Sequence, residues 1–570
     1  MPKRLIKLWR HCGEISLRLI DTENSQPDSY ATLSYCWGGP QPTQTTLANV
    51  KAYQVSLDWK IMPKTIQDAI ITTLELNLGY LWVDSLCIIQ DSEQDKEQEM
   101  AKMPDIYRQA IVTIAASVAG KVVEGFLQHD RLYNRDQIFR LPYICRNGEV
   151  GCVSLLPTNY DDLWNEGPLQ FRAWALQERA MSSRVLSFNR QSTRWLCPTS
   201  DSLSDGWMNA SEGHNGSLIL LAELPFQELS VEKFNLREKA KNRIDETLLH
   251  TNETSLTRSN APSSPKALEP RRIHSTLAVL DIWLKLIREY SGRTLSFSSD
   301  KFRAISAIAQ EFGKILDRPY LAGLWMIDPY VELLWEWDGY GPWEWDYVAP
   351  SWSWAAVSKV RYYNTGWSHT LTAEVIDVKV EWRNKLLQFG QAGHVERGEL
   401  SIKGHLLTVW WSAAQHEELW FDSERQKYLG RFLPDGQLNA RVETESHSGS
   451  ESESGPGAES EPGPASRNVS ARKPKLLPQT RMGVPSTRLT ASLSSKLPVF
   501  VLLLGVDNFG HTMSAKGLVL KRRDAKTFSR VGIFSMDSYR LSLPKGEERE
   551  NVEEKLEEFT KNPEEIVVIV

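Results

Sequence analysis

The residue patterns in this chain that could do chemistry lie between positions 34 and 178. Three strand-like runs end in polar side chains: Ser34, Tyr35 and Trp37 end the first, Asp84 and Ser85 end the second and Ser117 ends the third. Ligands of open α/β sheets bind at the carboxyl ends of the strands, where such side chains meet. We therefore expect these six positions to converge on one crevice.

A tryptophan and a glutamate follow at helical spacing. Trp174 and Glu178 are four residues apart, so on a helix they share a face. An aromatic ring beside a carboxylate can hold a sugar or a base and stabilise positive charge on it. A second interpretation stays open, in which Trp174 packs inward and Glu178 forms an ion pair with Arg172 or Arg179.

Other catalytic and metal-binding motifs are absent from the sequence. It contains no GxxxxGK(S/T) phosphate loop, no HExxH, no GxSxG and no protein-kinase motif set. Its six cysteines are scattered without a CxxC pair, unlike the clustered ligands of a structural zinc site. Cys36 and Cys87 lie in or at the end of apolar strands, so we interpret them as core thiols in a reducing compartment. We expect no metal and no bound cofactor.

The composition is that of an ordinary globular protein with several domains. A chain of 570 residues exceeds one hydrophobic core, which favours two or three domains. The net charge of −6 predicts no general attraction to nucleic acid or to an anionic membrane. The amino-terminal residues lack the apolar segment of a signal peptide, and the longest apolar run is far too short to span a bilayer. We expect a cytoplasmic protein whose 21 tryptophans fill tightly docked interfaces.

Strands and helices are predicted to alternate between residues 30 and 190. The predicted strands cover 30–37, 80–84, 110–116 and 184–188, and the predicted helices cover 63–74, 91–110 and 170–181. In the first helix Ile66, Ala69, Ile70 and Thr73 recur at the 3.6-residue period of a buried face. Pro104 should kink or restart the second helix. This alternation predicts crossover connections and a mainly parallel sheet.

The chain divides into five segments by composition. They are an α/β domain at 1–200, a polar connection at 201–272 with a disordered insertion at 236–272, a helical and then β-rich, Trp-rich region at 273–442, a disordered low-complexity linker at 443–496, and a hairpin-containing segment at 497–570 that completes the second region. Helices are expected from Ile273 and from Asp300. The whole is therefore an α/β domain followed by a mixed α+β region.

Five sequence blocks in order resemble those of the fungal heterokaryon-incompatibility (HET) domain. They are LSYCWG at 33–38, PKTIQDA at 63–69, YLWVDSLCIIQD at 80–91, the helical run 103–110, and RAWALQE at 172–178. The match covers about residues 30–190. This resemblance implies a role in non-self recognition, innate immunity and programmed cell death in filamentous fungi. Two departures stand out: Lys96 occupies a position where the family usually has Trp, and Pro104 interrupts a helix that is usually continuous.

HET domains are also similar to Toll/interleukin-1 receptor (TIR) domains, which have flavodoxin-like parallel sheets and in some cases cleave NAD. Residues 33–35 resemble the opening TIR strand, and Trp174 to Glu178 has the W-x-x-x-E spacing in which TIR NADases place their essential glutamate. The resemblance implies Glu178 as the catalytic residue and NAD as a substrate rather than a cofactor. The residues implied to contact it are Ser34, Tyr35, Trp37, Asp84, Ser117, Arg172 and Trp174.

A non-catalytic role stays open beside the enzymatic one. The same surfaces could nucleate self-association or recruit other HET or cell-death signalling proteins, with no nucleic acid, membrane or metal involved. Ser34, Trp174 and Glu178 should open onto one cleft in an enzyme. A buried or ion-paired Glu178 favours the signalling module.

Overall fold

A computed structural model provides the structure of the protein. It describes residues 1–11, 13–24, 27–127, 139–144, 148, 150–155, 167–190, 193–197, 200–203, 269–338, 347–362, 369–383, 395–412, 418–421, 428–435, 496–509, 512–537 and 552–570. The predicted insertion up to residue 268 and the low-complexity linker at 443–495 lie outside these residues.

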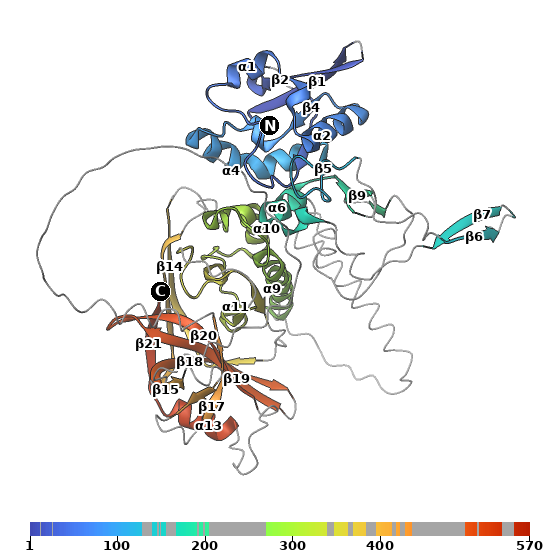
Figure 1. Ribbon diagram of the computed structural model, residues 1–570. Helices are drawn as coiled ribbons and strands as arrows, with labels where there is room; N and C mark the ends of the chain where they lie inside the picture. Colours follow the sequence, from blue (N-terminus) through green and yellow to red (C-terminus); the bar gives the residue numbers. More distant parts are fainter. Residues whose placement is uncertain are drawn as a thin grey trace, which may run out of the picture.

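An eight-stranded mixed sheet forms the amino-terminal part (Figure 1). Its strands are β1 (Arg4–His11), β2 (Glu14–Asp21), β3 (Ala31–Ser34), β4 (Tyr80–Trp82), β5 (Val112–Ala115), β8 (Val185–Phe188), β9 (Thr193–Cys197) and β10 (Ser200–Leu203), in the order β10-β9-β8-β5-β3-β4-β1-β2. The four central strands, β8-β5-β3-β4, are parallel, as the alternation of strands and helices predicts. The edge strands pair antiparallel, which the sequence analysis did not predict.

Helices connect the parallel strands. They are α1 (Val50–Val55), α2 (Lys64–Glu75), α3 (Asp84–Cys87), α4 (Glu93–Gln109) and α6 (Ala173–Met181). The parallel strands follow one another along the chain as β3, β4, β5 and β8, but across the sheet they lie in the order β4-β3-β5-β8. In this doubly wound order the switch point lies between the strands that are first and third in the chain. Here that point lies between β3 and β5, both of which are buried along their whole length, as expected for strands covered on both faces.

The long helix α4 crosses Pro104 without interruption. Ser92 caps its start by accepting a hydrogen bond from the backbone N–H of Asp95 at 3.3 Å, and the helix continues to Gln109. The expected restart at Pro104 is therefore wrong. Buried contacts of Met103, Ile106 and Tyr107 on either side of the proline outweigh the hydrogen bond that a proline removes.

The second region is built from helices around a cluster of aromatic rings. The helices are α9 (Glu269–Ser291), α10 (Ser306–Leu316) and α11 (Pro329–Leu333), with α10 beginning six residues later than expected. Helix α13 (Val552–Thr560) lies in a second hydrophobic core, where Phe559 stacks on Phe534. Trp283 is fully buried, and its ring centre lies 5.1 Å from that of Phe312 and 5.4 Å from that of Trp325. These tilted and edge-on ring pairs fill the core of the second region and add to the stabilisation from area burial.

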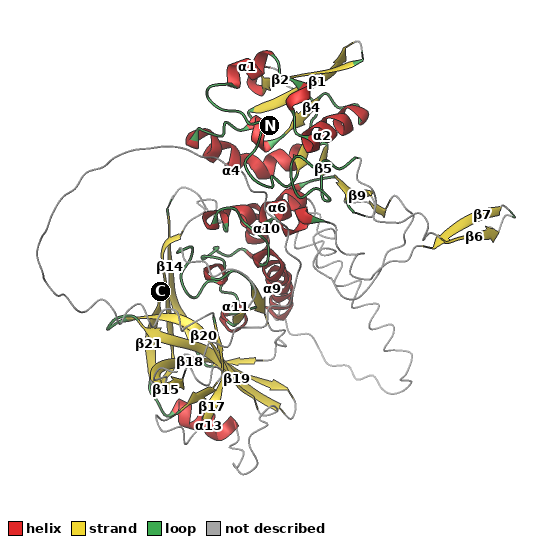
Figure 2. Cartoon of the chain, viewed as in Figure 1, coloured by secondary structure: helices red, strands yellow, loops and turns green. Residues whose placement is uncertain are grey.

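A nine-stranded sheet completes the second region (Figure 2). Its strands are β13 (His369–Leu371), β14 (Glu374–Trp382), β15 (Val395–Ser412), β16 (Glu418–Trp420), β17 (Tyr428–Pro434), β18 (Lys496–Phe509), β19 (Thr512–Arg522), β20 (Thr527–Asp537) and β21 (Glu564–Ile569). Two-stranded sheets pair β6 (Phe139–Ile144) with β7 (Val150–Leu155) and β11 (Trp335–Trp337) with β12 (Val360–Tyr362). The 3-10 helices are Thr22–Asn24, Trp59–Ile61, Pro168–Phe171, Ser298–Asp300, Arg303–Ile305 and Trp354–Ala356. Within the described ranges, no helix has the length and apolar character needed to cross a membrane.

Helix α6 joins the two regions (Figure 1). The amide of Ala173 at its start donates to the carbonyl of Thr294 at 3.0 Å, and the side-chain oxygen of Gln177 accepts the N–H of Ala307 at 2.8 Å. One hydrophobic core runs from Trp82 of the first region to Trp283 of the second. The helix that carries Glu178 is therefore held by both regions.

Candidate functional site

The predicted polar residues lie at one edge of the first sheet. Ser34 is the last residue of β3, Asp84 begins α3 directly after β4, and Ser117 lies two residues beyond β5. Since Ser34 pairs with Ala115 in the parallel register, the carboxyl ends of β3 and β5 lie level. These residues therefore flank the switch point, where open α/β sheets bind ligands.

Glu178 points from α6 at the end of β3. Its side chain is buried, and its carboxylate accepts a hydrogen bond from the hydroxyl of Ser34. The buried hydroxyl of Tyr107, from α4, donates to the carbonyl of Leu33 at 3.2 Å. Burial raises the pKa of Glu178 to about 7, although the charge of Arg172 and the hydrogen bonds of Ser34 and Tyr107 oppose this rise. The carboxyl group therefore changes its charge near neutral pH.

Arg172 lies between the strand ends at the start of α6. Its guanidinium donates to the carbonyl oxygen of Tyr35. Burial raises the pKa of both Glu178 and Asp84, and the positive charge of Arg172 opposes this rise. No ion pair to Glu178 occurs among the side chains that the structure describes. The carboxylate is thus buried without a direct charge partner. Burial is the arrangement that the sequence analysis associates with the non-catalytic signalling module, whereas the ion pair with Arg172 or Arg179 is not formed.

Asp84 forms a second acidic centre with the aromatic residues that follow β3. Its carboxylate accepts the indole N–H of Trp37 at 2.8 Å and the backbone N–H of Ser85 at 2.7 Å. The hydroxyl of Tyr35 donates to that of Ser85 at 3.0 Å. Burial raises the pKa of Asp84, and it also raises the pKa of Tyr35 well above its ordinary value. Trp37, Tyr35 and Asp84 therefore come together as a hydrogen-bonded group.

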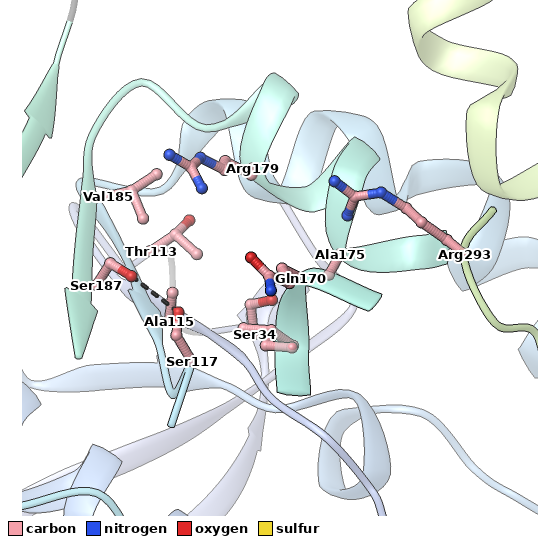
Figure 3. Close-up of a pocket in the computed structure, with 11 residues that line it drawn as sticks. Ser34, Thr113, Ala115, Ser117, Gln170, Ala175, Arg179, Val185, Ser187 and Arg293 are labelled. Carbon is pink, nitrogen blue, oxygen red and sulfur yellow. Dashed lines mark hydrogen bonds between the residues drawn. The ribbon is translucent and has the colours of Figure 1, made fainter. Parts of the chain in front are cut away.

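A small cavity lies beside Ser34, between β5, β8 and α6 (Figure 3). Ser34 and Ser117 line it, and the Ser117 hydroxyl lies 2.8 Å from that of Ser187. Gly167, two residues before the lining residue Leu169, has a φ of +129°, and a Cβ there would collide with the carbonyl oxygen of Ser117. The cavity measures about 30 Å³, room for two or three water molecules at about 10–15 Å³ each. In this conformation it is far too small for a dinucleotide.

Trp174 faces the second region rather than this cavity. Its indole N–H donates to the carboxylate of Asp300 at 3.4 Å. It packs against the core that the two regions share, whereas Glu178, one turn further along α6, contacts β3. The two residues of the W-x-x-x-E spacing therefore have different neighbours.

The structure adds residues that the sequence analysis did not assign to the site. Tyr107 lies four residues after Met103 on a predicted helix, and this spacing is typical of core residues. The spacing therefore did not indicate a role of Tyr107 in the site. Arg293 lines the cavity but lies more than a hundred residues from α6 along the chain. Only folding brings these side chains to the sheet edge.

The thiols of Cys36 and Cys87 are unsuited to nucleophilic catalysis. Burial raises the pKa of Cys36 to about 11 and that of Cys87 to about 12. Both therefore stay protonated at neutral pH, and a protonated thiol is a poor nucleophile. Across the described ranges no group of three or more His, Cys, Asp or Glu side chains is arranged to hold a metal ion.

The fold and the site together define a doubly wound α/β protein with a buried carboxyl group at its switch point. Residues 30–178 match the family model described as "Heterokaryon incompatibility protein (HET)". The match begins just before β3, ends at Glu178 and covers about a quarter of the chain. It confirms the similarity to HET proteins over this segment. Comparisons with curated proteins and with solved structures gave no match.

Proposed function

We propose that this chain acts in the cytoplasm in fungal non-self recognition and cell death, by cleaving the nicotinamide–ribose bond of NAD. The observation that carries the proposal is the carboxyl group of Glu178, placed at the switch point and held by the Ser34 hydroxyl. A pKa of about 7 leaves a large fraction of this group ionised at neutral pH. The W-x-x-x-E spacing of TIR NADases at Trp174 to Glu178 supports the same assignment.

The proposed reaction breaks the bond between the nicotinamide nitrogen and C1′ of the ribose. The bonding electrons leave with nicotinamide, and positive charge develops on the ribosyl centre. The Glu178 carboxylate stabilises this charge, as a carboxylate does in glycoside hydrolysis. Water then adds to C1′ and releases a proton, so that the products are ADP-ribose, nicotinamide and H⁺. Ser34 is the positioning residue, because its hydroxyl orients the carboxylate.

The small volume of the cavity makes conformational change part of this proposal. A dinucleotide cannot enter about 30 Å³, so α6 or the segment around Gly167 has to move before substrate binds. Helix α6 is held by the second region through Gln177 and Trp174. Release of these contacts on self-association would open the site and couple activation to assembly.

A non-catalytic assembly module is the second candidate. It is favoured by the burial of Glu178 and by the contact of Trp174 with Asp300 rather than with the site. In this case Glu178 stabilises the contact between α6 and β3. The chain would then signal by binding a second copy or another cell-death protein.

Nicotinamide release by the purified full chain separates the two candidates. Glu178→Gln keeps the size of the side chain and the acceptor for Ser34 but removes the charge. We expect it to lower release by about 100-fold or more, as loss of a key electrostatic stabiliser does. The matched control is Glu97→Gln, an exposed glutamate on α4, which should leave release unchanged.

Two outcomes would contradict the catalytic proposal. One is equal release by wild type and Glu178→Gln, and the other is no release by a concentrated, assembled wild type. Expression in a fungal host adds a second measurement, since cell death that persists in Glu178→Gln would support the assembly module.

A further inference from the structure

The turn between β19 and β20 carries a cluster of positive charges. Residues 521–526, the positive turn, read KRRDAK, with four positive side chains and one negative. Arg522, Arg523 and Lys526 are exposed, and none of them forms an ion pair among the residues that the structure describes. The carboxylate of Asp524 accepts two backbone N–H groups and one hydroxyl of the same turn at 2.6–2.8 Å. The turn therefore presents its positive charges to the solvent.

Two aromatic rings hold Arg522 in place. Its guanidinium carbon lies 4.9 Å from the ring centre of Phe500 and 5.1 Å from that of Phe528. The two rings meet edge to face, with their centres 5.2 Å apart. A guanidinium over aromatic rings keeps N–H groups at its edge for hydrogen bonds to carboxylates. The charge of Arg522 is thus positioned by the sheet beneath it.

Strand β17 carries the chain towards this positive turn. It runs antiparallel to β20, beginning with Arg431 opposite Ser535. At its end the amide of Asp435 donates to the carbonyl of Val531 at 2.9 Å. Each residue further along β17 therefore lies closer to the start of β20, which is where the positive turn lies.

The sequence becomes strongly acidic shortly after β17. Residues 442–461, the acidic stretch, contain six glutamates and no lysine or arginine, and they lie outside the residues that the structure describes. The eight residues from Asp435 to Glu443 span up to about 26 Å when extended. Val531 is five residues from Lys526, or roughly 17 Å along a strand. The acidic stretch can therefore reach the positive turn of its own chain.

We infer that the acidic stretch docks on the positive turn of the same chain. Its glutamate carboxylates pair with Arg522, Arg523 and Lys526 through charge-assisted hydrogen bonds. Exposed ion pairs are weak one by one, but a short tether raises the effective concentration of the stretch to the order of millimolar. Such docking needs no bond cleavage at Glu178, so it stands apart from the proposed enzymatic activity.

Fluorescence polarisation of a labelled synthetic peptide with the sequence of residues 442–461 tests this docking. The receptor is the full chain with its own acidic stretch neutralised by E443Q, E445Q, E451Q, E453Q, E459Q and E461Q. We expect this receptor to bind the peptide, and wild type to bind it about tenfold more weakly, because the tethered stretch occupies the turn. Raising the NaCl concentration from about 0.1 M to about 0.5 M should weaken binding several-fold.

Substitutions in the receptor locate the contact. Arg522→Gln combined with Arg523→Gln should weaken peptide binding about fivefold or more, the effect of losing two exposed ion pairs. Lys526→Gln is a second variant that leaves the aromatic contacts of Arg522 in place. The control Arg18→Gln removes an exposed charge from β2 and should change the affinity by less than about twofold. The melting temperature of each variant shows that it is folded.

Several results would overturn the inference. They are absence of peptide binding at millimolar concentration, equal binding by wild type and by the neutralised receptor, and equal weakening by Arg18→Gln and the arginine pair. A wild-type dimer in sedimentation velocity, lost on neutralisation of the stretch, would place the acidic stretch on a second copy instead. Binding of a DNA oligonucleotide or of phosphatidylserine vesicles that is equally tight in wild type and receptor would assign the turn to an outside polyanion.

Discussion

Replacing Glu178 by glutamine should stabilise the protein in a pH-dependent way. The pKa of Glu178 is about 7 in the folded protein and 4.5 in an ordinary environment, so the folded state holds this proton more tightly. This contribution to stability is fully present below pH 4.5 and is lost as the pH rises through 7. The difference corresponds to roughly 3 kcal/mol, at about 1.4 kcal/mol for each tenfold change in proton affinity.

Glutamine carries no charge at any pH and therefore avoids this loss. Relative to wild type, Glu178→Gln should gain roughly 3 kcal/mol between pH 4.5 and pH 8. For a region of 150–250 residues, the melting temperature of Glu178→Gln relative to that of wild type should therefore rise by about 6–12 °C over this pH range. Any fixed effect of the amide on packing is the same at both pH values and cancels in this comparison.

Differential scanning calorimetry at pH 5 and pH 8 provides the measurement. The exposed control Glu97→Gln should show the same difference from wild type at both pH values. A difference between Glu178→Gln and wild type that does not change with pH would refute the reasoning. It would mean that the pKa of Glu178 is the same in the folded and unfolded protein, so that burial does not disfavour the ionised carboxylate.

Two further substitutions probe parts of the fold away from the Glu178 charge. The carboxylate of buried Glu332 accepts hydrogen bonds from the backbone N–H groups of Trp325, Met326, Ile327 and Asp328 at 2.6–3.2 Å. Glu332→Gln should therefore lower the free energy of unfolding of the second region by about 3 kcal/mol, as measured by urea titration. A change below about 0.5 kcal/mol would contradict this role. Gly167→Ala should lower the free energy of unfolding by about 2 kcal/mol or more, because a Cβ would meet the Ser117 carbonyl at φ +129°. Gly39→Ala is its control, since Gly39 has a similar φ of +137° but open space around it, and an equal loss in both variants would show that the collision is unimportant.

The parallel centre of the first sheet could be predicted because its causes are local. Strands β3 and β5 are short runs that are buried along their whole length, and α2 presents Ile66, Ala69 and Ile70 at helical spacing to the core. The antiparallel edges could not be predicted in the same way. Pairing of β1 with β4 and of β8 with β9 depends on which edges remain open once the centre has formed.

The site was predictable in position but not in geometry. Polar residues after strands meet at one edge in any parallel sheet, which placed Ser34, Asp84 and Ser117 correctly at that edge. The direction of Trp174 could not be derived from its spacing to Glu178. It depends on Asp300, which the second region brings to the opposite side of α6.

The sequence by itself determined the doubly wound centre, the strand ends that meet at its switch point, and the similarity of residues 30–178 to HET proteins. The spacing of apolar residues and the polar residues at strand ends are patterns within short stretches of sequence, so they can be recognised without the structure. Only the tertiary structure decided that Glu178 is buried with its pKa raised to about 7, that Arg293 lines the same cavity as Arg179, and that this cavity has a volume of about 30 Å³. Burial, charge and volume are set by residues distant in the chain, and their positions relative to one another exist only once the two regions have packed around α6.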